Sequence, residues 1–178
     1  MDVRSQRGLT LIELLLVVAI IGIIAALAIP GLLRARIAAN EASAIGSMRA
    51  IITAQSTFAS GCAIGGYAQS LADLAKSPTG STAGFISPDL NANGVVKSGY
   101  VVSAGPGLVA TVVVAAAATC NGSAASAIAS YFAEAHPSSF GLTGQRSFGL
   151  DERTTIFQDL TGATFTAALV DAATSPAQ

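Results

Sequence analysis

The sequence has few of the residues that build catalytic and metal centres. It contains one His, His136, two Cys and no Trp, so imidazole and thiolate groups are too few for a transition-metal cluster. It also lacks P-loop, Gly-x-Ser-x-Gly and His-Glu-x-x-His motifs. We therefore predict that the chain is not an enzyme and that it needs no cofactor.

Charge is equally scarce. Charged residues make up 11% of the 178, the net charge is −1, and the nine Lys and Arg are scattered rather than clustered, so we expect no nucleic-acid binding. Hydrophobic residues make up 52%, a composition that excludes an intrinsically disordered chain. The length suits one domain with an accessory segment.

The accessory segment is an uncharged run from Leu14 to Leu33. As a helix its 20 residues would span roughly 30 Å, the thickness of the hydrocarbon core of a membrane. Arg4 and Arg7 precede the run and Arg34 and Arg36 follow it, so positive charge does not fix its orientation. We predict a transmembrane helix.

Two simple interpretations of this segment compete. A secretory signal peptide is one, with a small-x-small cleavage site at Ala26–Ala28. A plain membrane anchor is the other. The length of the run disfavours the signal peptide, and Glu13 inside the apolar pattern is unexplained by either interpretation.

The stretch RGLTLIELLLVVAIIGIIAALAIP, residues 7–30, resembles the prepilin signature of the type IV pilin superfamily. The resemblance implies that prepilin peptidase cleaves between Gly8 and Leu9 on the cytoplasmic side and that the new N-terminus at Leu9 is methylated. The family most often has Phe where Leu9 stands. Gly8 suits such a site because it has no side chain to obstruct the peptidase.

Glu13 is the candidate assembly residue. A carboxylate in an apolar helix costs about 2.5 to 3.5 kcal/mol at the middle of a bilayer, so such a residue is functional by default. Cleavage would create an α-amino group at Leu9, largely protonated at neutral pH. The resemblance implies that Glu13 of one subunit pairs with this amine of a neighbour.

Pro30 and Gly22 are the weak points of the apolar helix. Pro30 lacks the N–H that would bond back toward Ala26, and Gly22 has low helix propensity. We expect a kink or local unwinding here, and the resemblance implies that the stretch between them loses helicity in a filament.

Beyond Pro30 the pattern becomes amphipathic. Ile37, Ala44, Ile51 and Phe58 recur every seven residues, which predicts a buried helix face over residues 34–60. The opposite face is expected to be polar, with Arg34, Arg36, Glu41 and Arg49. One helix from Leu9 to Ser60, ending at Gly61, follows from this continuity.

The remaining residues, 61–178, predict a head domain. Residues 61–97 are expected to form a loop with a short helix near Gln69–Ala75, and Thr161–Gln178 a mobile tail. An antiparallel sheet is predicted from five strand-like stretches, Ser98–Ala104, Leu108–Ala115, Ala127–Ala135, Gln145–Leu150 and Thr154–Gln158.

These segments together predict an α+β, type IV pilin-like fold, in which a long N-terminal helix packs on the antiparallel sheet of the head. The expected parts are a leader over 1–8, a transmembrane and assembly helix over 9–33, an amphipathic helix over 34–60 and the head over 61–178.

Three features of the head are candidate sites. Cys62 and Cys120 form a disulfide if the head lies outside the cytoplasm, and two free thiols are the alternative. Asp89, Asn91 and Asn93 before Gly94 match the opening of a calcium loop, yet Tyr100 stands where the closing acid belongs, so an ordinary turn is the alternative. His136 is expected at a loop or strand end with no catalytic partner, and Asp151 and Glu152 in a solvated turn.

The resemblance implies a pilin, a structural subunit held in the inner membrane as a precursor and then polymerised into an extracellular pilus filament. Its partners would be further copies of itself, prepilin peptidase, an assembly ATPase and an inner-membrane platform protein. Two alternatives stay open. One is a pseudopilin of a type II secretion system in a short periplasmic fibre, and the other is a membrane-anchored binding module.

Overall fold

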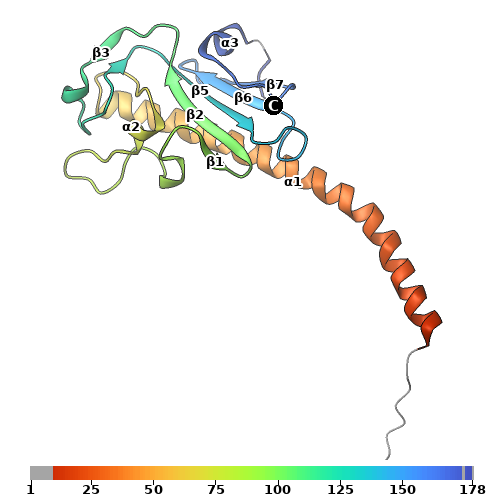
Figure 1. The fold of residues 1–178 in the computed structure, drawn as a ribbon. Helices are drawn as coiled ribbons and strands as arrows, with labels where there is room; N and C mark the ends of the chain where they lie inside the picture. Colours follow the sequence, from red (N-terminus) through yellow and green to blue (C-terminus); the bar gives the residue numbers. More distant parts are fainter. Residues whose placement is uncertain (1–9, 174, 178) are drawn as a thin grey trace, which may run out of the picture. The chain divides into compact units, whose positions relative to one another are not determined.

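The computed structural model describes residues 10–173 and 175–177, and the chain divides into two compact units, Met1–Arg36 and Ile37–Gln178. One helix, α1 (Leu11–Gly61), begins in the first unit and ends in the second (Figure 1). The division falls close to the predicted change from apolar to amphipathic sequence. The predicted boundaries at residues 8, 33 and 60 stay predictions.

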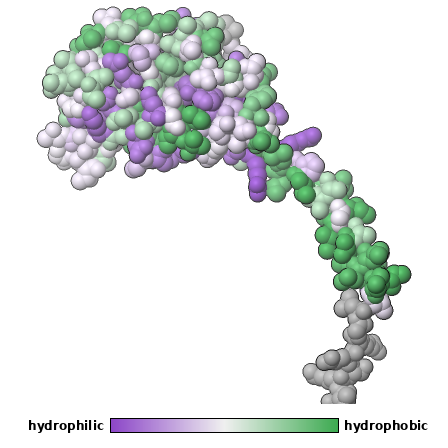
Figure 2. Space-filling view, viewed as in Figure 1, coloured by the Kyte–Doolittle hydropathy of each residue, from purple (hydrophilic) through white to green (hydrophobic). Residues whose placement is uncertain are grey.

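Within the first unit, α1 is an apolar helix whose side chains face outward. Its most apolar 18-residue window has a mean hydropathy of 3.0 and none of it is buried, so by length and composition it suits a membrane span. Figure 2 shows the hydrophobic side chains along this segment. The helix continues through Gly22 and Pro30, so the predicted unwinding between them is absent here and stays a prediction for the filament.

In the second unit, α1 buries the face that the seven-residue spacing predicts. Ile37, Ala44, Ile51 and Phe58 are all buried, which confirms the predicted helix face. Ala44, Ile51 and Phe58 join one hydrophobic core with Leu71, Tyr100, Phe148 and other buried side chains. The α+β prediction is thereby confirmed, because the core lies between this helix and a sheet.

The main sheet has five antiparallel strands in the order β1-β2-β5-β6-β7. The strands are β1 (Val95–Lys97), β2 (Tyr100–Pro106), β5 (Tyr131–Pro137), β6 (Ser147–Asp151) and β7 (Ile156–Asp159). β5 lies centrally and pairs with both β2 and β6. Its alternate residues therefore face the helix on one side and the C-terminal segment on the other.

Two of the predicted strands differ in the structure, because part of each forms a second, two-stranded sheet. Only β3 (Val112–Val114) forms within the predicted Leu108–Ala115, and it pairs with β4 (Ala127–Ile128). The predicted strand over Ala127–Ala135 is divided because Ser130 leaves the ladder and bonds the backbone N–H and C=O of Val109. A polar side chain that holds a loop in this way ends one strand before the next begins.

Short helices complete the head. α2 (Leu71–Ala75) has Ser70 as its N-cap, close to the predicted Gln69–Ala75. Two single-turn 3-10 helices span Pro88–Leu90 and Ala116–Ala118.

Part of the predicted tail, Thr161–Gln178, is folded over the described residues. α3 (Ala167–Ala172) buries Val170, which clusters with Phe157 and Phe165 on the outer face of the sheet. Gly149 in β6 makes room for them, because a Cβ there would lie 2.7 Å from Val170 and 2.8 Å from Phe165. The tail is thus a packed cover for the sheet.

Candidate functional site

The N-terminus of α1 holds the predicted assembly carboxylate in a capping box. The Thr10 N–H and the Thr10 hydroxyl donate to Glu13 Oε2 at 2.9 and 2.8 Å. The Glu13 N–H donates to Thr10 Oγ1 at 3.3 Å. Two orphan donors of the first turn are satisfied reciprocally, which is the function of the Thr-x-x-Glu pattern.

This geometry fixes where the negative charge lies. The carboxylate is turned back toward residue 10, at the helix end where the macrodipole favours an anion. Within residues 10–173 and 175–177 nothing donates to Glu13 Oε1, so one oxygen is available to a further donor. Gly8 and Leu9, the predicted cleavage and methylation residues, lie outside the described residues.

Around and beyond Glu13 the helix exposes an unusual amount of apolar surface. Fifteen large aliphatic side chains between Leu11 and Leu33 are 42 to 80% exposed. A contiguous apolar surface of this size on a chain with a folded head requires lipid or protein to cover it. The fifteen side chains are Leu11, Ile12, Leu14, Leu15, Leu16, Val17, Val18, Ile20, Ile21, Ile23, Ile24, Leu27, Ile29, Leu32 and Leu33.

The prediction that Glu41 lies on the exposed polar face of the helix is wrong. It is buried, and its Oε2 accepts the Arg146 Nε and Nη2 at 2.9 and 2.7 Å. Its Oε1 accepts the backbone N–H of Gln145 at 3.0 Å. The other amino group of Arg146, Nη1, donates to Gln158 in β7 at 2.9 Å. This Glu41–Arg146 clasp ties α1 to the segment that enters β6.

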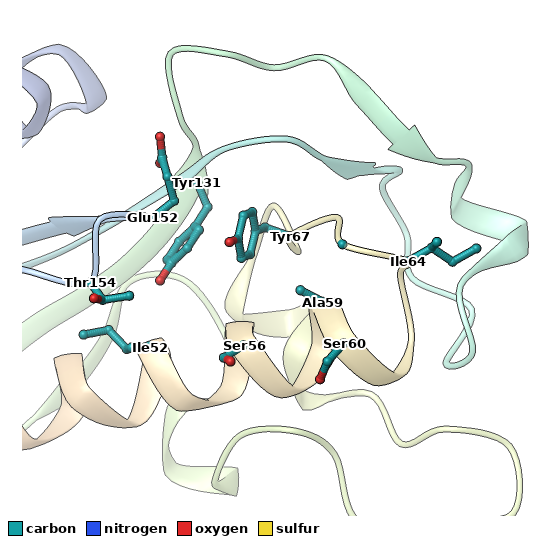
Figure 3. Close-up of a pocket in the computed structure, with 10 residues that line it drawn as sticks. Ile52, Ser56, Ala59, Ser60, Ile64, Tyr67, Tyr131, Glu152 and Thr154 are labelled. Carbon is teal, nitrogen blue, oxygen red and sulfur yellow. The ribbon is translucent and has the colours of Figure 1, made fainter.

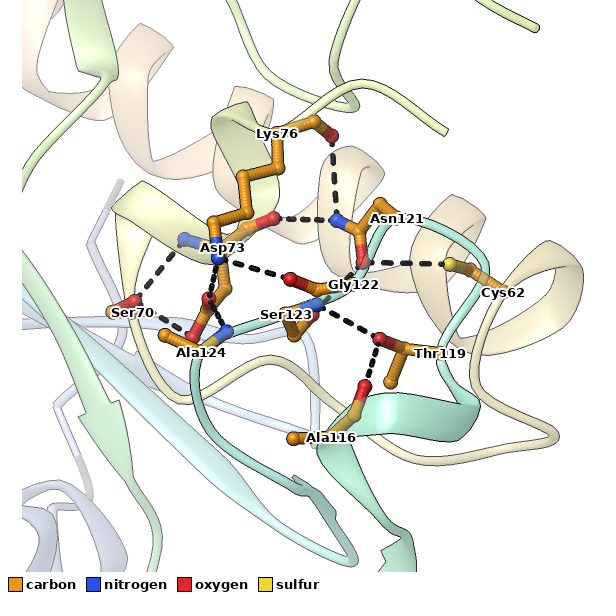
Figure 4. A network of polar contacts seen from close by, with 10 residues as sticks. All are labelled: Cys62, Ser70, Asp73, Lys76, Ala116, Thr119, Asn121, Gly122, Ser123 and Ala124. Carbon is orange, nitrogen blue, oxygen red and sulfur yellow. Dashed lines mark hydrogen bonds and ion pairs between the residues drawn. The ribbon is translucent and has the colours of Figure 1, made fainter. Parts of the chain in front are cut away.

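The predicted cysteine pair lies at the end of α1. Cys62 and Cys120 are joined by a disulfide with their Cα atoms 4.8 Å apart. Asn121, next to Cys120, donates through Nδ2 to the carbonyl of Asp73 at 2.7 Å, and the buried Asp73 accepts the N–H of Ala124 at 2.6 Å (Figure 4). The bridge therefore connects the helix end to a loop that α2 also holds.

The calcium candidates make other contacts. Asn93 uses its side-chain oxygen for the N–H groups of Leu71 and Ala104, and its amide nitrogen for the Ala104 carbonyl at 2.7 Å. Asp89 pairs with Lys97, which holds its pKa below the usual value. Asn91 caps the C-terminus of the turn Pro88–Leu90.

These contacts give the polar groups of Asn93 and Asp89 partners without a cation. Within the described residues no three His, Cys, Asp or Glu side chains form a possible metal site. Calcium at this loop stays a prediction.

His136 is near the end of β5, and its Nδ1 lies 2.8 Å from Oε2 of Glu134. Burial raises the pKa of Glu134, against the lowering effect of this hydrogen bond. Ser147 in β6 is fully buried, and its hydroxyl has no partner among the described residues. No hydrogen bond joins Ser147 to His136 in that part of the chain, and a fully buried hydroxyl is closed to substrate, so the three do not form a nucleophilic triad.

Asp151 also differs from its predicted place. It is buried, and its Oδ2 accepts Arg153 Nε at 2.7 Å, while Arg153 Nη2 donates to the carbonyl of Val170 at 2.8 Å. Of the two residues predicted to lie in a solvated turn, Glu152 is exposed and Asp151 is not.

Comparisons with known proteins concern the N-terminal part and a limited stretch of sequence. Residues 3–29 match the prokaryotic N-terminal methylation motif. The chain is 48% identical over 53 residues to the type IV major pilin protein PilA of Myxococcus xanthus (strain DK1622), a match that covers 30% of this chain and 24% of that protein. The chain thus spans about a quarter of the length of this relative. No solved structure matches.

Proposed function

Because the chain carries the prepilin-type motif of the type IV pilin superfamily, we propose that it is a pilin, a structural subunit of a type IV pilus. One observation carries the proposal. A helix with fifteen exposed aliphatic side chains starts at a capped carboxylate and continues into a folded head.

Such a helix is suited both to a lipid bilayer and to the core of a filament. Assembly transfers the helix from the bilayer to the filament. Before assembly the lipid core covers the apolar side chains over the roughly 30 Å that they span. In the filament the same side chains pack against those of neighbouring subunits, where close van der Waals packing replaces lipid contact. The head stays folded throughout, because its core does not include this segment.

The pairing of Glu13 with a neighbouring subunit fixes how the packed helices align along their length. Cleavage between Gly8 and Leu9 by prepilin peptidase leaves an α-amino group, and methylation at Leu9 keeps it basic. The free Oε1 of Glu13 accepts the amine of a neighbouring subunit. Pairing offsets the cost of removing both charges from water, whereas either charge alone would be strongly unfavourable in the filament core.

The proposed partners follow from this scheme. The subunit binds copies of itself, is processed by prepilin peptidase and is moved by an assembly ATPase through an inner-membrane platform protein. It resides in the inner membrane as a precursor and on the cell surface as a filament.

The test compares the N-terminal peptide mass in filaments sheared from cells with that in the remaining membranes. A peptide beginning at Leu9 in the sheared fraction is the expected result. The same peptide confined to membranes would replace the pilus with a short periplasmic fibre of a pseudopilin. An intact Met1 start, or a start at Ile29, would overturn processing altogether and favour an anchor or a signal peptide.

A further inference from the structure

The head contains a groove of about 430 Å³ between α1, the loop that follows it and the turn between β6 and β7 (Figure 3). Its apolar part is formed by Ile52, Ala59 and Ile64. Tyr67 and Tyr131 form one wall, with ring centroids 4.8 Å apart. Glu152 is the acidic residue at the groove.

Three polar groups of this groove have no hydrogen-bond or ion-pair partner within the described part of the chain. Tyr131 is only 1% exposed, yet its hydroxyl forms no hydrogen bond with any described residue. The same holds for the hydroxyl of Tyr67, and Glu152 forms no ion pair with those residues. The described residues leave these two hydroxyls and this carboxylate without partners, so the groove can accept a polar occupant that bonds to them.

The same chain presents a complementary surface on its N-terminal helix. Ile29, Leu32, Leu33 and Arg36 border one shallow hollow of α1, and their spacing of three, four and seven residues places them on one face. The three aliphatic side chains are 42 to 67% exposed. Arg36 is exposed and forms no ion pair with the described residues.

We infer that the groove of one copy receives the Ile29–Arg36 face of a second copy. The aliphatic side chains then contact Ile52 and Ile64, while Arg36 pairs with Glu152 and lies against the tyrosine pair. A guanidinium suits this place because it bonds a carboxylate in a fork and is attracted to aromatic faces. The inference rests on the proposed function, since it names a contact within the polymer.

Two features select a second copy as the occupant. The charges are complementary, because an unpaired Arg follows an exposed apolar run and an unpaired Glu borders an apolar groove. The two surfaces are also different parts of the chain. A contact between unlike surfaces of identical subunits is heterologous, and repeated without closure it produces an open helical fibre.

The experiment exchanges the two charges. Glu152→Arg, Arg36→Glu and the double substitution are produced with the assembly machinery, and sheared filament is measured relative to the processed subunit in the membrane. This ratio separates poor assembly from poor insertion. Asp171→Arg is the matched control, because Asp171 is exposed, forms no ion pair with the described residues and does not line the groove.

Each single substitution should lower the filament ratio about tenfold or more, because like charges placed together cost several kcal/mol. The double substitution should restore it to within about twofold of the unsubstituted chain, since the pair is re-formed with reversed signs. Asp171→Arg should leave the ratio unchanged.

Normal assembly of either single variant, or a double variant no better than the worse single, would overturn the inference while leaving the pilin proposal intact. An unsubstituted chain that yields no sheared polymer would instead refute the pilin proposal itself.

Discussion

The two units of the chain treat their apolar side chains in opposite ways. Between Leu11 and Leu33 the large aliphatic side chains are exposed, whereas 22 residues of the second unit form one buried cluster. The head therefore derives its stability from its own contacts, while the N-terminal helix depends on whatever surrounds it. Substitutions in the first unit should affect assembly, and substitutions in the buried cluster of the second should affect folding.

The largest expected effect is at Glu13. Glu13→Ala should lower the yield of sheared filament roughly 100-fold or more, because leaving one partner of a buried ion pair uncompensated costs about 3–5 kcal/mol. Thermal unfolding of the head, followed in detergent, should stay unchanged. A variant that assembles normally would show that Glu13 serves only as a helix cap, which Thr10→Val tests separately.

Removal of the disulfide should have the largest effect on the head. Replacing Cys62 and Cys120 together by Ser should lower the free energy of unfolding by about 4 kcal/mol, because a closed loop of 58 residues no longer restricts the unfolded chain. Denaturant unfolding of the full chain in detergent measures this. Equal stability of the oxidised and reduced chains would contradict it.

Loss of the Glu41–Arg146 clasp should be slightly less severe. Glu41→Ala should cost about 3 kcal/mol, the lower end for a broken buried pair, because Arg146 remains 30% exposed and is partly solvated. The control is Arg49→Ala on the same helix, an exposed position where the change should stay within about 0.5 kcal/mol. Similar unfolding curves for both variants would remove the clasp as a stabilising contact.

The smallest effect concerns pH. The pKa of Glu134 is raised above its usual 4.5 by burial, so Glu134 binds a proton more tightly in the folded head than in the unfolded chain. Its contribution to stability is complete below pH 4.5 and is lost as the pH rises through the folded-state pKa. The free energy of unfolding of the natural chain, minus that of Glu134→Gln, should therefore fall as the pH rises from about 4. A difference independent of pH would contradict this.

The first unit and the buried face of the long helix could be predicted because their signals are long and periodic. An apolar run of 20 residues and a seven-residue spacing through Ile37, Ala44, Ile51 and Phe58 have few alternative interpretations. The capping box was available in the same letters, Thr10-Leu11-Ile12-Glu13. Glu13 is predicted to act in assembly, and its local contact with Thr10 is not among the predictions.

Two features of the head depend on contacts between residues far apart in the chain, and a single sequence does not reveal such contacts. Glu41 was predicted to be exposed because a charged helix residue usually is, and its partner Arg146 lies 105 residues away. The tail was underestimated because Phe165 and Val170 stand among small and polar residues without a period. The burial of both depends on the space that Gly149 leaves in β6, which is evident only once the strands are paired.

The position of the clasp and the disulfide has a mechanical consequence. Glu41 lies near the start of the buried part of α1, and Cys62 directly follows its end. A pull along this part of the helix is therefore opposed at both ends, by an ion pair at one and a covalent bond at the other. The head therefore resists separation from this part of α1 under tension, and extension is expected instead in the stretch around Gly22 and Pro30 of the first unit.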